Sequence, residues 1–173
     1  MKKELFIIVL LICILANIIR AVYEILKHKK RLTANKLTFV IVFINMLLLW
    51  MSWFALCAFD IHKTEIINVI RYSGIALAGI GVVIFLTALF TIKSLESYEG
   101  DLITTGIYSI TRHPMYLAFI LWIIGLPVYF EALTALYLSL LFIANILFWR
   151  YLEEKELVYR FPAYKEYRKR TLF

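Results

Sequence analysis

The residue types best suited to binding chemistry gather in one short segment. Arg112 and His113 stand directly before Pro114, and Tyr116 follows two positions later. Proline suits the first position of a helix, because its missing N–H would have no partner there and its fixed φ is already helical. Arg112 and His113 are therefore expected just before a helix amino terminus, which attracts anions. The alternative is an interfacial anchor, in which the same side chains contact lipid head groups.

A second group of charged residues stands further along the chain. Arg150 is followed by the adjacent carboxylates Glu153 and Glu154 and by Lys155. A carboxylate pair facing an Arg–His pair would form a dipolar site for a zwitterionic ligand. The alternative is an exposed helix end with Glu–Lys pairs, which contribute only about 0.2–0.5 kcal/mol each. A site exists only if the fold brings both groups to the same edge.

The composition determines which elements must position these groups. The 173 residues are 63% hydrophobic and 18% charged, and their mean hydropathy is +0.83. An ordinary soluble domain is about 45–50% apolar and about 25% charged. Since a membrane-spanning helix takes roughly 20 apolar residues, the chain has room for spans and for no separate soluble domain. The sequence therefore predicts an all-α fold, a polytopic transmembrane helix bundle that forms a single domain, 1–173.

Five apolar runs mark the predicted spans. The fourth is short and ends in Gly125-Leu126-Pro127, so it is expected to be the first arm of a tight helical hairpin with the fifth. The aromatic and basic residues that follow predict an amphipathic tail at the membrane interface. The chain then divides into three N-terminal spans, 1–92, and a loop, hairpin and tail, 93–173. The runs are Leu5–Leu26, Leu37–Phe59, Tyr72–Ile92, Met115–Phe130 and Ala132–Trp149.

The positions of the basic residues predict the orientation in the membrane, because cytoplasmic loops retain lysine and arginine. Five lie in the first loop, two in the third loop (Lys93 and Arg112) and seven in the tail, against four on the other side. The amino terminus is therefore expected outside and the carboxyl terminus in the cytoplasm. The same residues explain the net charge of +7 as a membrane signal, since each attracts anionic head groups, so nucleic-acid binding is not required.

Polar residues inside the spans need partners. Arg20 and Glu24 are one helical turn apart and share a face with Asn17. Ionisable residues within a membrane are functional candidates by default, but an ion pair between Arg20 and Glu24 is the favoured interpretation. Asn45 and Asn145 are expected to form hydrogen bonds between helices.

The third predicted span contains small residues at a spacing typical of helix packing. Gly74 and Ala78 have small-xxx-small spacing, and Gly79 and Gly81 follow. This pattern lets helix backbones approach closely in lipid. Close packing is therefore predicted for these glycines, in preference to cofactor binding.

The two charged groups belong to longer motifs. One is Gly106-x-Tyr108-x-x-x-Arg112-His113-Pro114-x-Tyr116, and the other is Glu153-Glu154-x-x-Leu157-x-x-x-Phe161. In this order, around a predicted hairpin, they resemble the isoprenylcysteine carboxyl methyltransferase and phospholipid methyltransferase superfamily of integral membrane methyltransferases. The resemblance covers roughly the last 80 residues.

The resemblance implies an enzyme, an S-adenosylmethionine-dependent methyltransferase that works at the membrane surface without a Rossmann domain. It implies that a lipid or lipidated acceptor enters laterally from the bilayer. Charge complementarity assigns Arg112 or His113 to the cofactor carboxylate and the glutamates to its ammonium or ribose hydroxyls. Arg112 and Arg150 are the candidate catalytic residues, which would orient an anionic acceptor. Carried over by position, the cofactor-binding residues are Gly106, Tyr108, His113, Pro114, Tyr116, Glu153 and Glu154.

Methyl transfer requires alignment and exclusion of water more than a metal, and no zinc-type spacing of ligands is present in the sequence. If the acceptor is an amine, Glu153 or Glu154 would be the base. Prenylated cysteine, phospholipid amines and thiols all remain open as acceptors, as does the oligomeric state. The alternatives are an NADPH-dependent sterol-type membrane reductase, which the adjacent glutamates disfavour, and a non-catalytic membrane scaffold.

Overall fold

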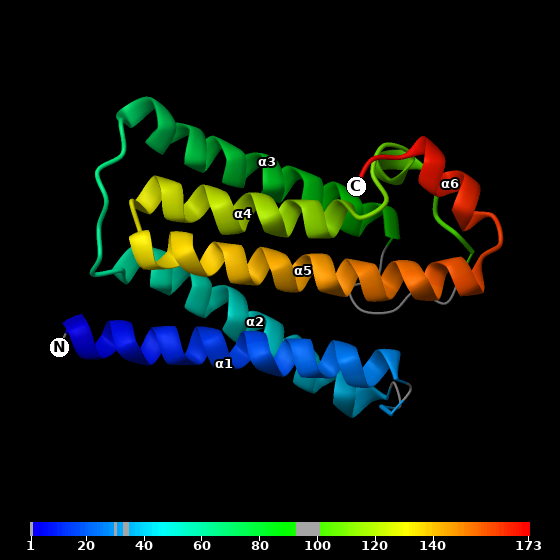
Figure 1. Cartoon of the computed structure of the whole chain (residues 1–173), viewed down its shortest axis with the longest axis horizontal. Coiled ribbons are helices and arrows are strands. Elements are labelled where there is room, and N and C mark those ends of the chain that lie inside the picture. The colour runs from blue at the N-terminus through cyan, green and yellow to red at the C-terminus, as the bar shows by residue number, and fades with distance from the viewer. Residues whose placement is uncertain (1, 30, 33–34, 93–100) are drawn as a thin grey trace.

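The computed structural model describes residues 2–29, 31–32, 35–92 and 101–173. In this part of the chain the regular elements are all helical (Figure 1). They are α1 (Lys2–His28), α2 (Lys36–Phe59), α3 (Asn68–Ile92), the 3-10 helix η1 (Gly106–Ser109), α4 (Pro114–Phe130), α5 (Leu133–Arg160) and α6 (Tyr164–Arg170).

Four of these helices, α1, α2, α3 and α5, are long and apolar enough to cross a membrane. The fifth, α4, has 17 residues and is apolar but shorter, about 26 Å at 1.5 Å per residue. Large apolar side chains on the outside, such as Leu11, Val83 and Leu140, are more than half exposed, as expected for a surface that faces lipid. These features confirm the predicted polytopic bundle.

The helices alternate in direction, so the polar groups of interest meet at one end (Figure 1). The carboxyl ends of α1, α3 and α5 lie there with the amino ends of α2 and α4 and with α6. We call this the α6 end. The basic residues predicted to share one side lie at this end, except Lys30 and Lys93, which fall outside the described residues. The predicted division at 92/93 also borders the undescribed 93–100.

Glycines bring α3 and α4 into direct backbone contact. A Cβ atom added to Gly74 would lie 2.6 Å from the carbonyl oxygen of Gly125, and one added to Gly81 would lie 2.7 Å from the Trp122 ring. Such distances leave no room for a side chain. Gly79 is different, because nothing lies within 4 Å of an added Cβ. The packing prediction is confirmed for Gly74 and Gly81 and wrong for Gly79, which is on the outer face of α3.

The predicted hairpin of α4 and α5 is present, and Pro127 lies inside α4. The helix continues to Phe130, and Glu131 turns the chain in the left-handed region at φ 56°. Because proline has no N–H, the carbonyl of Ile123 loses its usual helical partner. The Ser139 hydroxyl of α5 donates to that carbonyl at 2.7 Å. A hydrogen bond from the neighbouring helix thus replaces the missing one and lets the proline remain within the helix.

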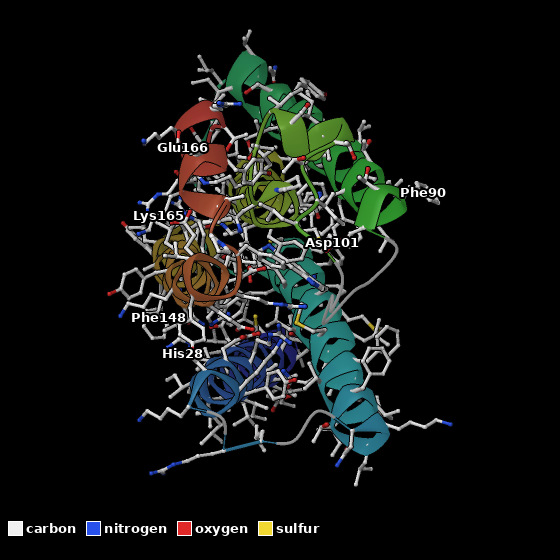
Figure 2. All side chains as sticks on the ribbon, turned by 90° about the vertical axis from the view of Figure 1, so that its right-hand side faces the viewer. His28, Phe90, Asp101, Phe148, Lys165 and Glu166 are labelled. Atoms are coloured by element: carbon white, nitrogen blue, oxygen red, sulfur yellow. The ribbon has the colours of Figure 1, made fainter. Side chains whose placement is uncertain are left out.

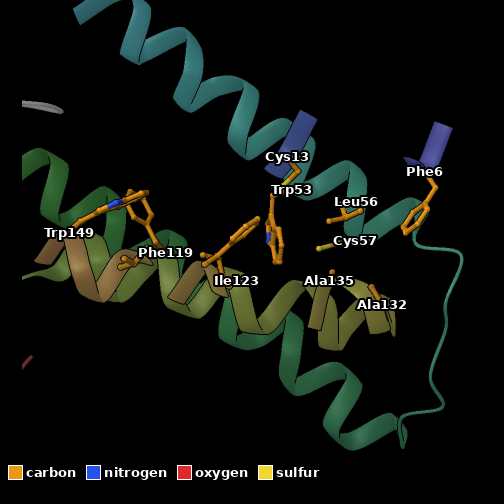
Figure 3. Packing of buried hydrophobic residues seen from close by; sticks show 12 residues of the cluster. Phe6, Cys13, Trp53, Leu56, Cys57, Phe119, Ile123, Ala132, Ala135 and Trp149 are labelled. Atoms are coloured by element: carbon orange, nitrogen blue, oxygen red, sulfur yellow. The ribbon is translucent and has the colours of Figure 1, made fainter. Parts of the chain in front are cut away.

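A buried cluster of residues from α1, α2, α4 and α5 holds the bundle together (Figure 3). Trp53 is fully buried, and its ring centroid lies 5.2 Å from that of Phe142. At the end of α2, the buried Asp60 carboxylate accepts a hydrogen bond from the backbone N–H of Ala135 at 3.1 Å. This acceptor satisfies one of the unpaired N–H groups of the first turn of α5.

Hydrogen bonds inside the bundle join α1 to both neighbours. The Asn145 amide donates to Asn17 Oδ1 at 2.6 Å, and the Asn45 amide donates to the carbonyl of Ala16 at 3.1 Å. The interhelical role predicted for these two asparagines is therefore confirmed. By contrast, α2 and α3 have almost no mutual contacts, since α1 packs on α2 and α3 packs on α4.

Candidate functional site

The loop before α4 places Arg112 and His113 as the sequence predicts. Gly106 opens η1 at φ +59°, a conformation that glycine adopts without strain. Pro114 is the first residue of α4, and His113 occupies the position immediately before it. The imidazole is therefore beside the amino terminus of α4, and it is almost completely buried.

The second group lies on α5, which extends beyond the predicted apolar run. The apolar run ends at Trp149, whereas α5 continues to Arg160, so Glu153 and Glu154 are fixed on a rigid element. His113 lies between them: Nδ1 is 3.6 Å from Glu153 Oε2, and Nε2 is 3.3 Å from Glu154 Oε1. The fold therefore brings the two charged groups, far apart in sequence, into direct contact at the α6 end.

The two glutamates have different surroundings. Glu154 is buried and is surrounded by arginines, with Arg112 Nε at 3.3 Å, Arg150 Nε at 3.6 Å and Arg168 Nε at 3.6 Å. The Glu153 side chain is 46% exposed. Glu154 thus has the contacts of an internal structural centre, while Glu153 remains accessible to a ligand.

Arg112 ties the loop to the C-terminal tail. Its Nη1 donates to the carbonyls of Arg168 and Thr171. The backbones also pair, since Arg112 N–H donates to Leu172 O at 3.0 Å and Leu172 N–H donates to Ile110 O at 2.8 Å. Its Nε also lies 3.3 Å from Glu154 Oε1, and the Arg112 side chain is only 8% exposed. Its contacts are those of a residue that positions the loop and the tail.

Two tyrosines hold α6 over the loop. The Tyr164 hydroxyl lies 3.4 Å from His113 Nε2, and the Tyr167 hydroxyl donates to the carbonyl of Tyr108. Burial and the nearby charge of Glu154 raise the pKa of Tyr164 above its usual range, so its phenol stays protonated. The tail therefore packs over the predicted site.

The charge of His113 follows from the same contacts. Burial lowers its pKa, but the hydrogen bonds and negative charges of Glu153 and Glu154 outweigh burial, and the net pKa is raised above 6.5. An imidazolium can donate from both ring nitrogens, one toward each carboxylate. This arrangement keeps a cation between two anions beside the amino terminus of α4.

A cavity of about 610 Å³ opens beside this cluster at the α6 end, the end that faces the viewer in Figure 2. Three of the predicted residues, Gly106, Arg150 and Glu154, do not line it. Arg150 instead pairs with Glu154 and lies 4.5 Å from the centroid of the Phe173 ring. The predicted residues that do line the cavity are Tyr108, Arg112, His113, Pro114, Tyr116 and Glu153.

Sequence reasoning did not place several other residues at the cavity. Arg20 and Glu24 of α1 form the predicted ion pair, but they also line the cavity. Their position within an apolar run was the available signal. The aromatic wall, which includes Trp50, Phe85 and Phe119, carried no signal because such residues are common in any membrane span. Within the described ranges, no group of three His, Cys, Asp or Glu residues could hold a metal ion.

Comparison with known proteins gives one match. The model of the phospholipid methyltransferase family matches residues 69–163, from the first turn of α3 to the residue before α6. Neither the curated proteins nor the solved structures contain a match. The matched region holds the loop, the α4–α5 hairpin and both glutamates, and it covers more than half of the chain. The chain therefore belongs to the phospholipid methyltransferase family.

Proposed function

We propose that this membrane protein is an S-adenosylmethionine-dependent methyltransferase whose cofactor binds in the cavity at the α6 end. The observation that carries the proposal is the His113–Glu153–Glu154 cluster beside that cavity, inside the family-matched region. S-adenosylmethionine would supply an electrophilic methyl group on a sulfonium. No comparable cluster is required for the stability of a simple helix bundle.

The residues present suit such a ligand, which carries an ammonium, a sulfonium and a carboxylate. The accessible Glu153 carboxylate matches the ammonium or the ribose hydroxyls. The amino terminus of α4 and the His113 imidazolium match the carboxylate. Tyr108, Tyr116 and Tyr164 line the cavity and can stack on adenine or face the sulfonium.

For Arg112 and Arg150 we propose a positioning role, because their contacts run to Glu154 and to the tail. Together they keep Glu154 charged and keep α6 over the loop. This arrangement excludes water from one side of the cavity, as a displacement at a methyl group requires. If the acceptor is an amine, Glu153 is the carboxylate placed to remove its proton.

The acceptor is proposed to be lipophilic, a phospholipid amine, an isoprenylcysteine carboxylate or a thiol, and to reach the cavity from the bilayer. The orientation predicted from the basic residues places this cavity at the cytoplasmic face. We also propose that the whole chain acts as one membrane domain, because α1 and the loop before α4 line the same cavity.

The test combines binding and turnover on purified protein. Calorimetric titration in detergent is expected to show binding of S-adenosylmethionine, and Glu153→Gln should weaken it at least about tenfold, because a charge-assisted hydrogen bond is lost. Glu131→Gln makes the same chemical change at the opposite end and should leave the affinity unaltered. Radiolabelled methyl groups should enter a native lipid extract. Binding of NADPH without S-adenosylmethionine, or the absence of both binding and labelling, would overturn the proposal.

A further inference from the structure

The cavity has two charged walls, one on α5 and one on α1. The α5 wall has an excess of acidic residues and the α1 wall has an excess of basic residues. The α5 wall has two acidic residues and one basic residue, and the α1 wall has two basic residues and one acidic residue, with a histidine beside them. These residues are Glu153, Glu156 and Arg160 on α5, and Arg20, Glu24, Lys27 and His28 on α1. The acidic wall suits the cationic donor proposed above, which leaves the basic wall for a ligand of the opposite charge.

Arg20 is the most firmly held cation of the α1 wall. It is 9% exposed and pairs with Glu24, and its guanidinium carbon lies 5.3 Å from the Tyr23 ring centroid and 5.5 Å from that of Trp149. Two rings within cation–π distance restrict the guanidinium, so its planar set of donors is preorganised. Placing a charged group at this depth in a membrane costs free energy. A helix with only a structural role does not need such a group.

The apolar part of the same cavity lies between α2 and α3. Phe43 and Leu47 of α2 face it and are each more than 40% exposed, and Phe85 and Leu89 of α3 line the opposite side. Because α2 and α3 hardly touch, the described residues leave the space between these two helices open. Figure 2 shows α2 set apart from α3 at this end.

Aromatic rings close the inner end of this space. The Trp50 centroid lies 4.9 Å from that of Phe119 and 5.2 Å from that of Trp122, and the Phe85 centroid lies 5.7 Å from that of Phe119. An extended hydrocarbon chain could therefore lie between α2 and α3 and end against these rings. Its polar end would then be near Arg20.

We propose that the α1 wall and the α2–α3 space form the acceptor subsite. Arg20 binds a phosphate or carboxylate group of a lipid, and the lipid chain lies between Phe43 and Phe85. This proposal rests on the proposed function and deepens it. It defines the part of the acceptor that contacts the protein as one anionic group joined to one hydrocarbon chain. The α1 and α2 residues involved lie outside the family-matched residues 69–163. The N-terminal hairpin thus supplies the cation and one side of the chain-binding space, while the matched part supplies the other side and holds the donor.

The first test uses tryptophan fluorescence of the purified protein in neutral detergent, with ω-bromododecyl phosphate as the probe. Bromine quenches a ring on contact, so binding beside Trp50 should give saturable quenching. Unbrominated dodecyl phosphate should reverse it, and Trp50→Phe should remove most of it. Equal quenching by ω-bromododecanol, or equally effective competition by inorganic phosphate, would show that the anionic group and the chain are not recognised together, and would overturn the proposal.

The second test uses two substitutions with opposite expected effects. Arg20→Gln should weaken binding of the phosphate probe about tenfold, because the cation is lost, whereas Glu24→Gln should strengthen it, because a competing carboxylate is lost. A purely structural ion pair predicts losses in both variants, and that result would refute the subsite. Arg71→Gln, at the far end of α3, is the matched control and should bind the probe like the parent.

Titration with S-adenosylmethionine in the same samples separates this subsite from the donor site. Arg20→Gln should retain the cofactor affinity within about twofold. If the parent protein binds the probe but not S-adenosylmethionine, the proposed function fails and the anion subsite stands. If it binds S-adenosylmethionine while the two substitutions at Arg20 and Glu24 leave probe binding unchanged, the subsite fails alone.

Discussion

At the scale of single residues, His113 joins the two halves of the site. It is buried, yet its surroundings favour the charged imidazole because a carboxylate faces each ring nitrogen. The raised pKa of His113 means that protonation and folding support each other. This coupling has a definite sign, because the folded protein binds the proton more tightly than the unfolded chain does.

The stabilisation due to His113 should therefore be complete below pH of about 6.5, the ordinary histidine pKa, and should be lost as pH rises through the raised value. Thermal unfolding in detergent across this range measures it. The difference in Tm between the parent and His113→Asn is expected to be largest in acid and to shrink in base. A difference that instead grows with pH at His113 would contradict the assignment.

The sequence predicted which residues form this cluster, but not that Glu153 and Glu154 have different surroundings. Charge and the position before Pro114 were sufficient to predict that His113 and the glutamates lie on opposite sides of one site, but not that the His113 imidazole contacts both carboxylates directly. The difference between Glu153 and Glu154 was not predictable, because it depends on Arg168 and on a tail that folds back over the loop. Contacts of that kind arise from tertiary packing and leave no local periodicity.

At the scale of elements, α4 depends on its neighbour. Pro127 removes one helical hydrogen bond, and Ser139 of α5 satisfies the carbonyl of Ile123 that is left. Within a membrane, no water is available to donate a hydrogen bond to an unsatisfied carbonyl. The pair Pro127 and Ser139 therefore acts as a unit that joins the two arms of the hairpin.

Ser139→Ala should destabilise the protein by about 1–2 kcal/mol, because the buried carbonyl of Ile123 loses its donor. In a Pro127→Ala background the same substitution should cost less, since alanine restores the backbone N–H. A double-mutant cycle on unfolding in mixed micelles would measure this coupling. Additive effects of the two substitutions would show that Ser139 does not compensate for the proline.

Hydropathy located the spans closely, but the end of an apolar run is not always the end of a helix. The fifth apolar run stops at Trp149, but the following residues are good helix formers, so α5 continues to Arg160 and carries both glutamates. The fourth run was predicted to end at Phe130, and α4 does end there. Pro127 remains within the helix because a donor on another helix replaces the missing bond. That replacement is not visible in the residues of α4 alone.

At the scale of the whole molecule, the structure makes the proposed orientation testable. Cys13 and Cys57 are completely buried, so an engineered surface cysteine can be labelled selectively. With a membrane-impermeant maleimide on intact cells, Glu65→Cys should react, because it lies at the end predicted to be outside. Lys165→Cys on α6 should react only after permeabilisation. The reverse pattern would place the cavity on the outer face and refute the prediction from the basic residues.

The length of α5 has a consequence for how such an enzyme would respond to its reactants. Its 28 residues extend about 42 Å, while the hydrocarbon core of a bilayer is about 30 Å thick. The glutamates near its end can therefore sit in the head-group layer, reached by a charged molecule from water and by a lipid from the side. Turnover would then follow the bulk concentration of one reactant and the surface mole fraction of the other. Diluting the acceptor with inert lipid should slow the reaction even when its total amount is unchanged.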